Sequence, residues 1–375
     1  MSREANDIAL SILLVSTSYP RDMRDWQGRF IADMVQALAA ENSLHLWAPL
    51  GELPSNVHYC VSAQDSAWLT KLTNAGGIAH LLRHRRITGV ISALGLLRRL
   101  YFAYRQRPLV DVAHVNWLQN ALPLWGTKIP ALITILGSDF ALLKLPGMVT
   151  TLRKMMNQRR CILAPNAAWM APVLRQHFGD IAEVRAIPFG VEKKWFALQR
   201  TKTSQTVQKW LVITRLTKNK LGDLLEWGRD CFGHGRELHL FGPMQEELVL
   251  PDWLHYHGPT NPDELQQKWF PHASGLITLS RHDEGRPQII LEAMASGLPV
   301  IASDLPAHKD LIRHLETGWI ATSRVDLRAA LDFLSDVDNN SRMGLAAKTW
   351  VSSEVGTWDD CAARYKKAYA DLMHQ

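Results

Sequence analysis

Ten short, continuous apolar runs most constrain the fold of this chain, because longer segments with helical spacing separate them. The first half contains SILLVS, SLHLWAP, DVAHVN, ALITILG and CILAPN, and the second half contains WLVITR, ELHLFG, LHYHG, GLITLS and PVIAS. Strands that are apolar along their whole length are typical of parallel sheets covered on both faces by helices. The pattern therefore predicts an α/β protein built from Rossmann-like domains.

The length of 375 residues exceeds what one hydrophobic core usually holds, so we expect two domains. A polar stretch without a strand pattern, residues 189–208, marks the linker between them. We predict an N-terminal Rossmann-like domain over residues 1–190 and a C-terminal one over residues 191–355, with parallel sheets facing a central cleft. An amphipathic helix in residues 356–375 is predicted to pack back on the N-terminal domain.

Composition narrows the class of protein. Apolar residues make up 47% and charged residues 21%, as in ordinary globular proteins. The four cysteines show no CxxC spacing, which argues against a disulfide framework and a zinc site and favours a reducing, cytoplasmic compartment. The apolar run near the N-terminus follows acidic residues and is typical of a buried strand rather than a signal peptide. No run approaches the ~18 apolar residues that a membrane-spanning helix needs.

Positive charge is concentrated in the first half of the chain. Residues 1–200 hold 23 Lys and Arg against 13 Asp and Glu, whereas residues 201–375 hold 19 against 23. Within the first half, residues 81–108 mix seven arginines with Leu, Phe and Tyr, a pattern that suits peripheral binding to an anionic membrane surface. A helix pair packed on the first domain, with arginines that reach out to water, explains the same pattern equally well. The positive charge of this half of the chain slightly favours membrane binding. No nucleic-acid-binding module is recognisable.

Three predicted strand ends in the second domain carry polar residues. Ligands of open parallel sheets bind beyond the carboxyl ends of the strands, where helices begin. Arg215 follows WLVIT and Lys220 comes five residues later, which places two cations at such an end. Gly242 ends the next strand, in a turn whose backbone amides are expected to approach a phosphate. These residues predict a site for an anionic ligand.

The stretch EGRPQIILEAMASGLPVIASD adds two carboxylates, Glu284 in a loop and Glu292 in the helix that follows. Backbone N–H groups at the start of that helix, at Gln288 and Ile289, are free to bind a ligand. An acid beside an anion site is costly unless it serves hydroxyl groups. A sugar joined to a nucleotide through a diphosphate has both kinds of group. Taken alone, two glutamates at this spacing are also explained as an acid in a loop and a solvent-exposed acid on a helix, without any role in binding.

This stretch resembles the two-glutamate signature of retaining GT-B glycosyltransferases of family four, the glycosyl transferases group 1. The resemblance extends in order through SYPRDMRDWQGRFIADMVQALA, ITILGSDF, IPFGVE, ITRLTKNK and HGPTNPDELQQKW, which span nearly the whole chain. It implies transfer of a sugar from a UDP-, GDP- or ADP-linked donor to a glycan acceptor, one carried on a lipid in bacterial surface polysaccharide or lipopolysaccharide synthesis.

The resemblance also implies roles for individual residues. Arg215 and Lys220 match the pair that binds the diphosphate and neutralises the leaving group. Glu284 matches the glutamate near the sugar hydroxyls, and Glu292 the one on the ribose. The loop whose backbone touches sugar and phosphate corresponds to Gly285, Arg286, Pro287 and Gln288, and Gly28 matches the glycine loop of the first domain, although a plain turn glycine is an equal alternative.

With two fixed cations at the leaving group, a divalent metal and any other cofactor become unnecessary. The motif DVD at Asp336–Asp338 resembles a metal-binding acid pair, but it follows a predicted helix near the C-terminus instead of a buried strand. We read it as a surface loop that ends that helix. No metal site is therefore predicted.

One position departs from the family pattern. The family commonly has a histidine where this chain has Leu136, so that role cannot be transferred. His114, at another strand end, is a candidate to face the cleft, although buried structural histidines are common. Ser138 and Asp139 are further polar candidates for contacting the acceptor.

Two other functions remain open at this stage. A nucleotide-sugar epimerase or another GT-B enzyme shares the fold, and such an enzyme turns over its donor without an acceptor. A catalytically silent partner subunit is disfavoured because Arg215, Lys220, Glu284 and Glu292 are all present. Fold resemblance alone does not distinguish these functions.

Overall fold

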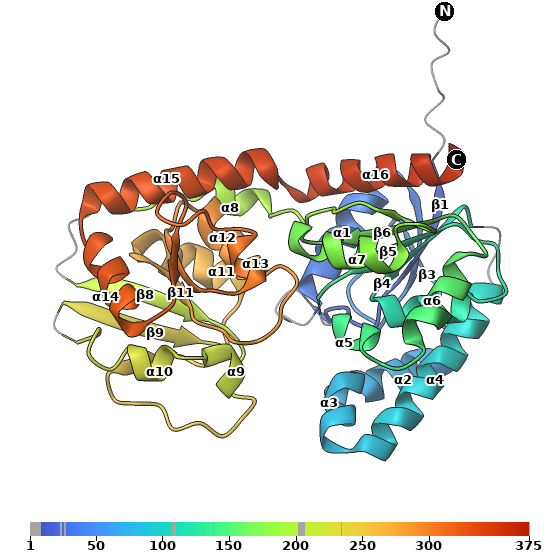
Figure 1. Cartoon of the computed structure of the whole chain (residues 1–375), viewed down its shortest axis with the longest axis horizontal. Coiled ribbons are helices and arrows are strands. Elements are labelled where there is room, and N and C mark those ends of the chain that lie inside the picture. Colours follow the sequence, from blue (N-terminus) through green and yellow to red (C-terminus); the bar gives the residue numbers. More distant parts are fainter. Residues whose placement is uncertain are drawn as a thin grey trace, which may run out of the picture. The chain divides into compact units, whose positions relative to one another are not determined.

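The computed structural model describes residues 9–22, 25, 28–106, 110–137, 139–201, 207–233 and 235–374 (Figure 1). Within these residues the chain divides into two compact units, unit 1 with residues 1–189 and 361–375, and unit 2 with residues 190–360. Each unit is built around its own parallel sheet with helices packed against it. The predicted α/β class with two Rossmann-like domains is confirmed.

The sheet of unit 1 has seven parallel strands in the order β3-β2-β1-β4-β5-β6-β7. Every residue of β4, β5 and β6 is buried, which explains their continuous apolar sequences. The strands are β1 (Ser11–Val15), β2 (Ser43–Trp47), β3 (Val57–Tyr59), β4 (Val112–Asn116), β5 (Ala131–Ile135), β6 (Cys161–Pro165) and β7 (Glu183–Val184). The α-helices are α1 (Arg29–Ala39), α2 (Ala63–Asn74), α3 (Gly77–His84), α4 (Arg86–Arg105), α5 (Phe140–Leu143), α6 (Met148–Met156) and α7 (Ala171–Phe178).

The sheet of unit 2 has six parallel strands in the order β10-β9-β8-β11-β12-β13. They are β8 (Gln208–Ile213), β9 (Arg236–Phe241), β10 (Leu254–Tyr256), β11 (Gly275–Thr278), β12 (Val300–Ser303) and β13 (Trp319–Ala321). The α-helices are α8 (Lys193–Ala197), α9 (Lys218–Leu221), α10 (Leu224–Trp227), α11 (Pro262–Glu264), α12 (Gln288–Ala295), α13 (Pro306–Lys309), α14 (Arg324–Phe333) and α15 (Val337–Glu354). The predicted cap of α11 is confirmed, since Asn261 Oδ1 accepts from Glu264 N at 2.9 Å.

Three edge strands have no counterpart among the ten apolar runs. β3 and β7 are the two edges of the first sheet, and β13 is an edge of the second. Each contains only two or three residues. Strands of two or three residues leave little pattern to read, and of these only β10 coincides with one of the ten runs.

Helices α2, α3 and α4 form a group at one end of unit 1 (Figure 1). α4 lies close to α3 at Gly89, where an added Cβ would approach Leu82 N to 2.6 Å. Its inner face buries Leu96, Leu100 and Tyr104. The predicted helix pair of residues 81–108 thus packs on unit 1, with residues 107 and 108 outside the described part. None of the helices, within the residues described, is long and apolar enough to cross a membrane.

Helix α16 (Trp358–His374) begins in unit 2 and packs through its C-terminal half on unit 1. The side chains of Tyr365 and Tyr369 are completely buried there. Tyr369 OH lies 2.6 Å from His114 Nδ1, and Thr134 Oγ1 lies 2.8 Å from His114 Nε2. Thr134 also contacts Tyr365 OH at 3.2 Å. A buried polar cluster therefore fixes the end of the chain against β4 and β5.

This geometry corrects the sequence hypothesis for His114. The side chain is completely buried under α16, and both ring nitrogens have hydrogen-bond partners within unit 1. Burial lowers the pKa of His114 to about 3, so the imidazole is neutral at pH 7. His114 is a structural residue, because the return of α16 to the sheet closes over it.

Replacement of His114 by Gln is expected to flatten the pH dependence of stability. Between pH 6.5 and about 3 the unfolded chain binds a proton at His114 that the native protein does not, so the free energy of unfolding falls as the pH falls. The loss amounts to about 2 kcal/mol between pH 7 and pH 5. Urea unfolding of wild type and His114→Gln at both pH values measures this fall in the free energy of unfolding. The control is His255→Gln, which changes an exposed histidine. Equal falls in wild type and His114→Gln would contradict this account.

Candidate functional site

Two loops meet at the carboxyl edge of the sheet of unit 2, one after β8 and one after β11. Arg281 N donates to Asn219 O at 2.8 Å, which ties the loops together. Gly222 lies between them with φ 54°, and a Cβ on this residue would come within 1.8 Å of Leu279 O. Because β8 and β11 are parallel neighbours, their following loops leave the sheet on the same side.

This approach brings Lys220 and Glu284 into contact. Lys220 belongs to α9, whose start is capped by Thr217 Oγ1 accepting from Lys220 N at 3.2 Å. Its Nζ lies 2.5 Å from Glu284 Oε1, and the two side chains are only 12% and 17% exposed. Ser280 Oγ lies 3.5 Å from the same carboxylate oxygen. An ion pair shielded in this way is held in a defined geometry.

Electrostatics link Arg215 to this pair. Burial, the largest cause, lowers the pKa of Lys220; the charge and hydrogen bond of Glu284 oppose this shift, and the positive charge of Arg215 adds to it. Two cations and one carboxylate therefore share this edge. The structure brings together the three residues to which the sequence assigns the reacting centre.

The segment that follows Glu284 is largely buried and leads into α12. Arg286 Nη2 lies 3.6 Å from Asp310 Oδ2, and both side chains are at most 10% exposed. Gln288 donates from Nε2 to Gly190 O at 2.9 Å, while its Oε1 is buried without a hydrogen-bond partner. Gly285 is buried and Pro287 precedes the first residue of α12. This loop is held rigidly on both sides.

Glu292 and Ile289 lie within α12. Ile289 is the second residue of the helix and Glu292 the fifth, and both are partly buried. The geometry thus places the second glutamate about one turn beyond the loop of Glu284, as the sequence analysis expects.

His308 is a polar neighbour that sequence reasoning missed. It belongs to α13, after β12, and is completely buried. Its Nδ1 lies 3.0 Å from Ser303 O, which fits a proton on Nδ1, and its Nε2 is buried without a hydrogen-bond partner. Burial lowers the pKa of His308, the charge of Glu284 opposes this shift, and that of Lys220 adds to it. No motif signals this residue, because only the pairing of β11 with β12 brings it near the ion pair.

Gly242 does not offer its amide to a ligand, contrary to the sequence hypothesis. Its N–H donates to Gly258 O at 2.8 Å, and its carbonyl accepts from Tyr256 OH at 2.9 Å. A Cβ would come within 1.7 Å of Thr214 O. The glycine is required by close packing between strand ends.

Asp139 is also structural, which corrects its proposed contact with an acceptor. The side chain is buried; Oδ2 accepts from Leu118 N at 2.9 Å and Oδ1 from Leu136 N at 3.3 Å. Both carboxylate oxygens thus hold the backbone around β5. Ser138 lies outside the described residues.

Gly28 precedes α1 with φ 74°, and a Cβ there would lie 2.5 Å from Ser18 Oγ and 2.8 Å from Tyr19 N. Packing within unit 1 therefore suffices to explain the glycine. Its predicted role at a diphosphate stays a prediction.

The Asp336–Asp338 motif starts a helix in the structure. Asp336 caps α15 by accepting from Asn339 N at 2.8 Å. The loop that the sequence predicts does follow the end of α14, but Asp336 also caps the helix after it. Across the described parts of both units, no three His, Cys, Asp or Glu side chains are grouped in a way that could hold a metal ion.

Residues 233–350 match the model of the family described as glycosyl transferases group 1. The matched segment contains Glu284 and Glu292. The similarity to this family thus covers 118 of the 375 residues. The match falls entirely within unit 2 and agrees with the resemblance in the sequence.

Comparison with individual proteins agrees with this match. The chain is 29% identical over 130 residues to a D-inositol 3-phosphate glycosyltransferase of Streptomyces scabiei, covering 34% of this chain and 28% of that protein. The aligned part thus spans less than a third of that relative's length.

Solved structures with the same fold cover almost the whole chain. Sucrose-phosphate synthase from Thermosynechococcus elongatus has a TM-score of 0.71 at 15% identity, over 96% of this chain and 98% of that one. Anabaena HepE in complex with UDP-glucose has a TM-score of 0.66 at 13% identity, over 96% and 100%. These likenesses confirm the GT-B fold.

Replacement of Gly222 by Ala is expected to disrupt the meeting of the two loops. The new methyl group would collide with Leu279 O, in addition to the cost of about 1 kcal/mol for a side chain at positive φ. Gly258→Ala is the matched control, since Gly258 has φ 78° and no atom within 4 Å of its added Cβ. Thermal unfolding should show a loss at least about 2 kcal/mol larger for Gly222→Ala; equal losses would mean that the loops do not need this close approach.

Proposed function

We propose that this chain is a retaining glycosyltransferase that moves a sugar from a nucleotide-diphosphate donor to a lipid-linked glycan acceptor in bacterial surface polysaccharide or lipopolysaccharide synthesis. The observation that carries the proposal is the shielded pair of Lys220 and Glu284 beside Arg215, at the carboxyl edge of a sheet whose unit matches the glycosyltransferase family. The site combines cations for a diphosphate with an acid for hydroxyl groups.

In the proposed reaction, the bond between the anomeric carbon and the diphosphate oxygen breaks. The acceptor hydroxyl forms a new bond to that carbon with the same configuration, and its proton leaves with the nucleoside diphosphate. Arg215 and Lys220 stabilise the negative charge that develops on the diphosphate, an effect worth several kcal/mol in a shielded site. Glu284 orients a sugar hydroxyl, and Glu292 binds the ribose.

Lys220 and Glu284 are each other's partner in the structure, but an ammonium has three donors and a carboxylate several acceptor sites, so both can bind a donor while they stay paired. A diphosphate supplies a further partner for the ammonium, and a sugar hydroxyl supplies one for the carboxylate. The donor thereby adds two interactions to the ion pair. HepE, which shares the fold, has been solved with UDP-glucose, and this supports a nucleotide sugar as the donor class.

The acceptor half of the proposal rests on the outer face of α4. Apolar side chains are exposed there at helical spacing, with Ile87 79% and Ile91 64% exposed and Val90 and Leu94 beside them. Two basic residues, Arg98 and Arg105, follow further along α4. An exposed apolar helix face with basic residues beside it suits binding in the interface of an anionic membrane, where lipid-linked acceptors are found.

Donor binding can be tested by thermal shift with UDP, GDP and ADP. One nucleotide should raise the melting temperature in a saturable way. Arg215→Lys should weaken that response, because lysine lacks the planar, multi-donor guanidinium group of arginine.

Glu284→Gln should keep the nucleotide response, while its rate of sugar transfer should fall by at least about 100-fold. Transfer at wild-type rate by Glu284→Gln would refute the role of this carboxylate, and donor turnover without acceptor would indicate an epimerase.

Turnover is expected to continue in excess EDTA. Two protein cations at the leaving group replace the divalent ion, so chelation should leave the rate within about two-fold of the untreated enzyme. Rates are compared before chelation, after chelation and after addition of Mg²⁺. A loss of activity that Mg²⁺ restores would contradict the cation-pair account.

Binding to vesicles tests the role of α4. Wild type should bind phosphatidylglycerol-containing vesicles more tightly than neutral ones. Ile91→Glu should weaken binding about 10-fold or more, because a charge replaces an apolar anchor worth about 1.5–3 kcal/mol. The matched control is Val325→Glu, which changes a residue 76% exposed on α14 of unit 2. Equal binding of both variants in a sedimentation assay would remove α4 from the membrane contact.

A further inference from the structure

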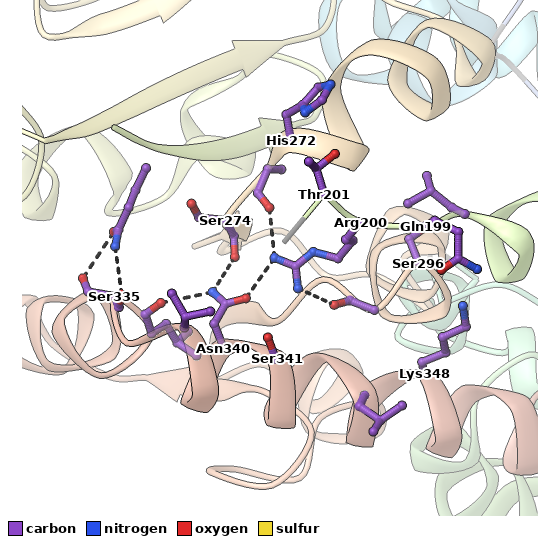
Figure 2. Close-up of a pocket in the computed structure, with 17 residues that line it drawn as sticks. Gln199, Arg200, Thr201, His272, Ser274, Ser296, Ser335, Asn340, Ser341 and Lys348 are labelled. Carbon is purple, nitrogen blue, oxygen red and sulfur yellow. Dashed lines mark hydrogen bonds between the residues drawn. The ribbon is translucent and has the colours of Figure 1, made fainter. Parts of the chain in front are cut away.

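A second polar pocket lies in unit 2, away from the edge that carries Lys220 and Glu284. It has a volume of about 330 Å³ and is bounded by residues 198–201, the turn before β12 and the first turns of α15 (Figure 2). Gln208 begins β8, and Ser274 and Gly297 precede β11 and β12. The pocket therefore lies at the amino edge of the sheet. Six residues of β8 separate the two edges by roughly 20 Å.

The described lining of this pocket is cationic and rich in hydroxyl groups. Arg200 and Lys348 line it together with His272, and it contains no Asp or Glu. Hydroxyl groups come from Thr201, Ser274, Ser296, Ser335 and Ser341. Figure 2 shows Arg200 and Lys348 reaching it from different segments, the stretch before β8 and α15. Such a lining suits a ligand that carries both negative charge and hydroxyl groups.

Arg200 is held in the pocket wall by neutral acceptors. Its Nη1 donates to Gly297 O at 2.8 Å, and Nη2 donates to Ala273 O at 3.0 Å and to Asn340 Oδ1 at 2.9 Å. Its Nε is buried without a hydrogen-bond partner. Burial lowers the pKa of Arg200 to about 10, since no carboxylate compensates it. A shielded cation without a counter-charge is costly to retain, and a bound anion would offset that cost.

Lys348 supplies the second positive charge. Its Nζ donates to Phe196 O at 2.5 Å, which uses one of the three donors of an ammonium group. The nearest helix start does not add to the charge, because the carboxylate of Asp336 already caps α15. Attraction for an anion thus comes from the two side chains.

We propose that this pocket binds a small phosphorylated polyol, such as a hexose phosphate, independently of the nucleotide sugar. The phosphate group lies near Lys348 and Arg200, and the hydroxyl groups of the ligand bond to the serine and threonine side chains. The volume is at the lower end of the range for small-molecule sites. A ligand here joins the segment before β8 to α15, so it stabilises unit 2 from the edge opposite the ion pair.

Thermal shift of the full chain at constant ionic strength tests this proposal with three probes: glucose 6-phosphate, inorganic phosphate and glucose. Glucose 6-phosphate should raise the melting temperature in a saturable way and more strongly than the other two probes. Lys348→Ala should weaken its affinity about 10-fold or more, and Ser341→Ala should weaken it less. Lys309→Ala, at the carboxyl edge, and Glu284→Gln should leave it unchanged.

Each other result would overturn a stated part of the proposal. Absence of a saturable shift with glucose 6-phosphate, or an equal shift in Lys348→Ala, would mean that Arg200 and Lys348 only join segments of the fold. Loss of the shift in Glu284→Gln would place the ligand at the donor edge. An equal response to inorganic phosphate would remove the polyol from the assignment.

Discussion

The contact between Lys220 and Glu284 is the interaction on which the carboxyl edge of the sheet of unit 2 depends. The residues are 64 positions apart in the sequence, yet their charged atoms lie 2.5 Å apart. Parallel pairing of β8 with β11 sends their loops to one side, and Gly222 allows the loops to touch. The pair therefore follows from sheet topology. Charged groups placed in this way are held by contacts within the protein itself.

Burial decides which of the polar candidates are structural. His114 and Asp139 lie at strand ends of unit 1 and have side chains suited to catalysis, but tertiary contacts enclose both of them. α16 covers His114, and backbone amides occupy both carboxylate oxygens of Asp139. At the edge of unit 2, by contrast, Lys220 and Glu284 keep part of their surface exposed. Position at a strand end is thus not sufficient for a site.

Unit 2 holds cations at both edges of one sheet, in different surroundings. At the carboxyl edge a carboxylate accompanies them, whereas the described lining of the pocket at the amino edge contains none. The first arrangement suits a ligand with a diphosphate and sugar hydroxyls, and the second suits a phosphate with hydroxyl donors around it. The arrangement of acids around the cations, more than the net charge, distinguishes the two edges.

The sequence by itself determined ten of the strands, the α/β class and the segment with both glutamates, because burial on two faces demands continuous apolar runs that are visible in one dimension. It could not reveal β3, β7 or β13, whose few residues carry no periodicity. Only the tertiary structure decided that His114 is enclosed, that the backbone groups of Gly242 are hydrogen-bonded within the protein, and that His308 lies near the ion pair. These properties depend on contacts between residues distant in sequence, and no local pattern encodes such contacts.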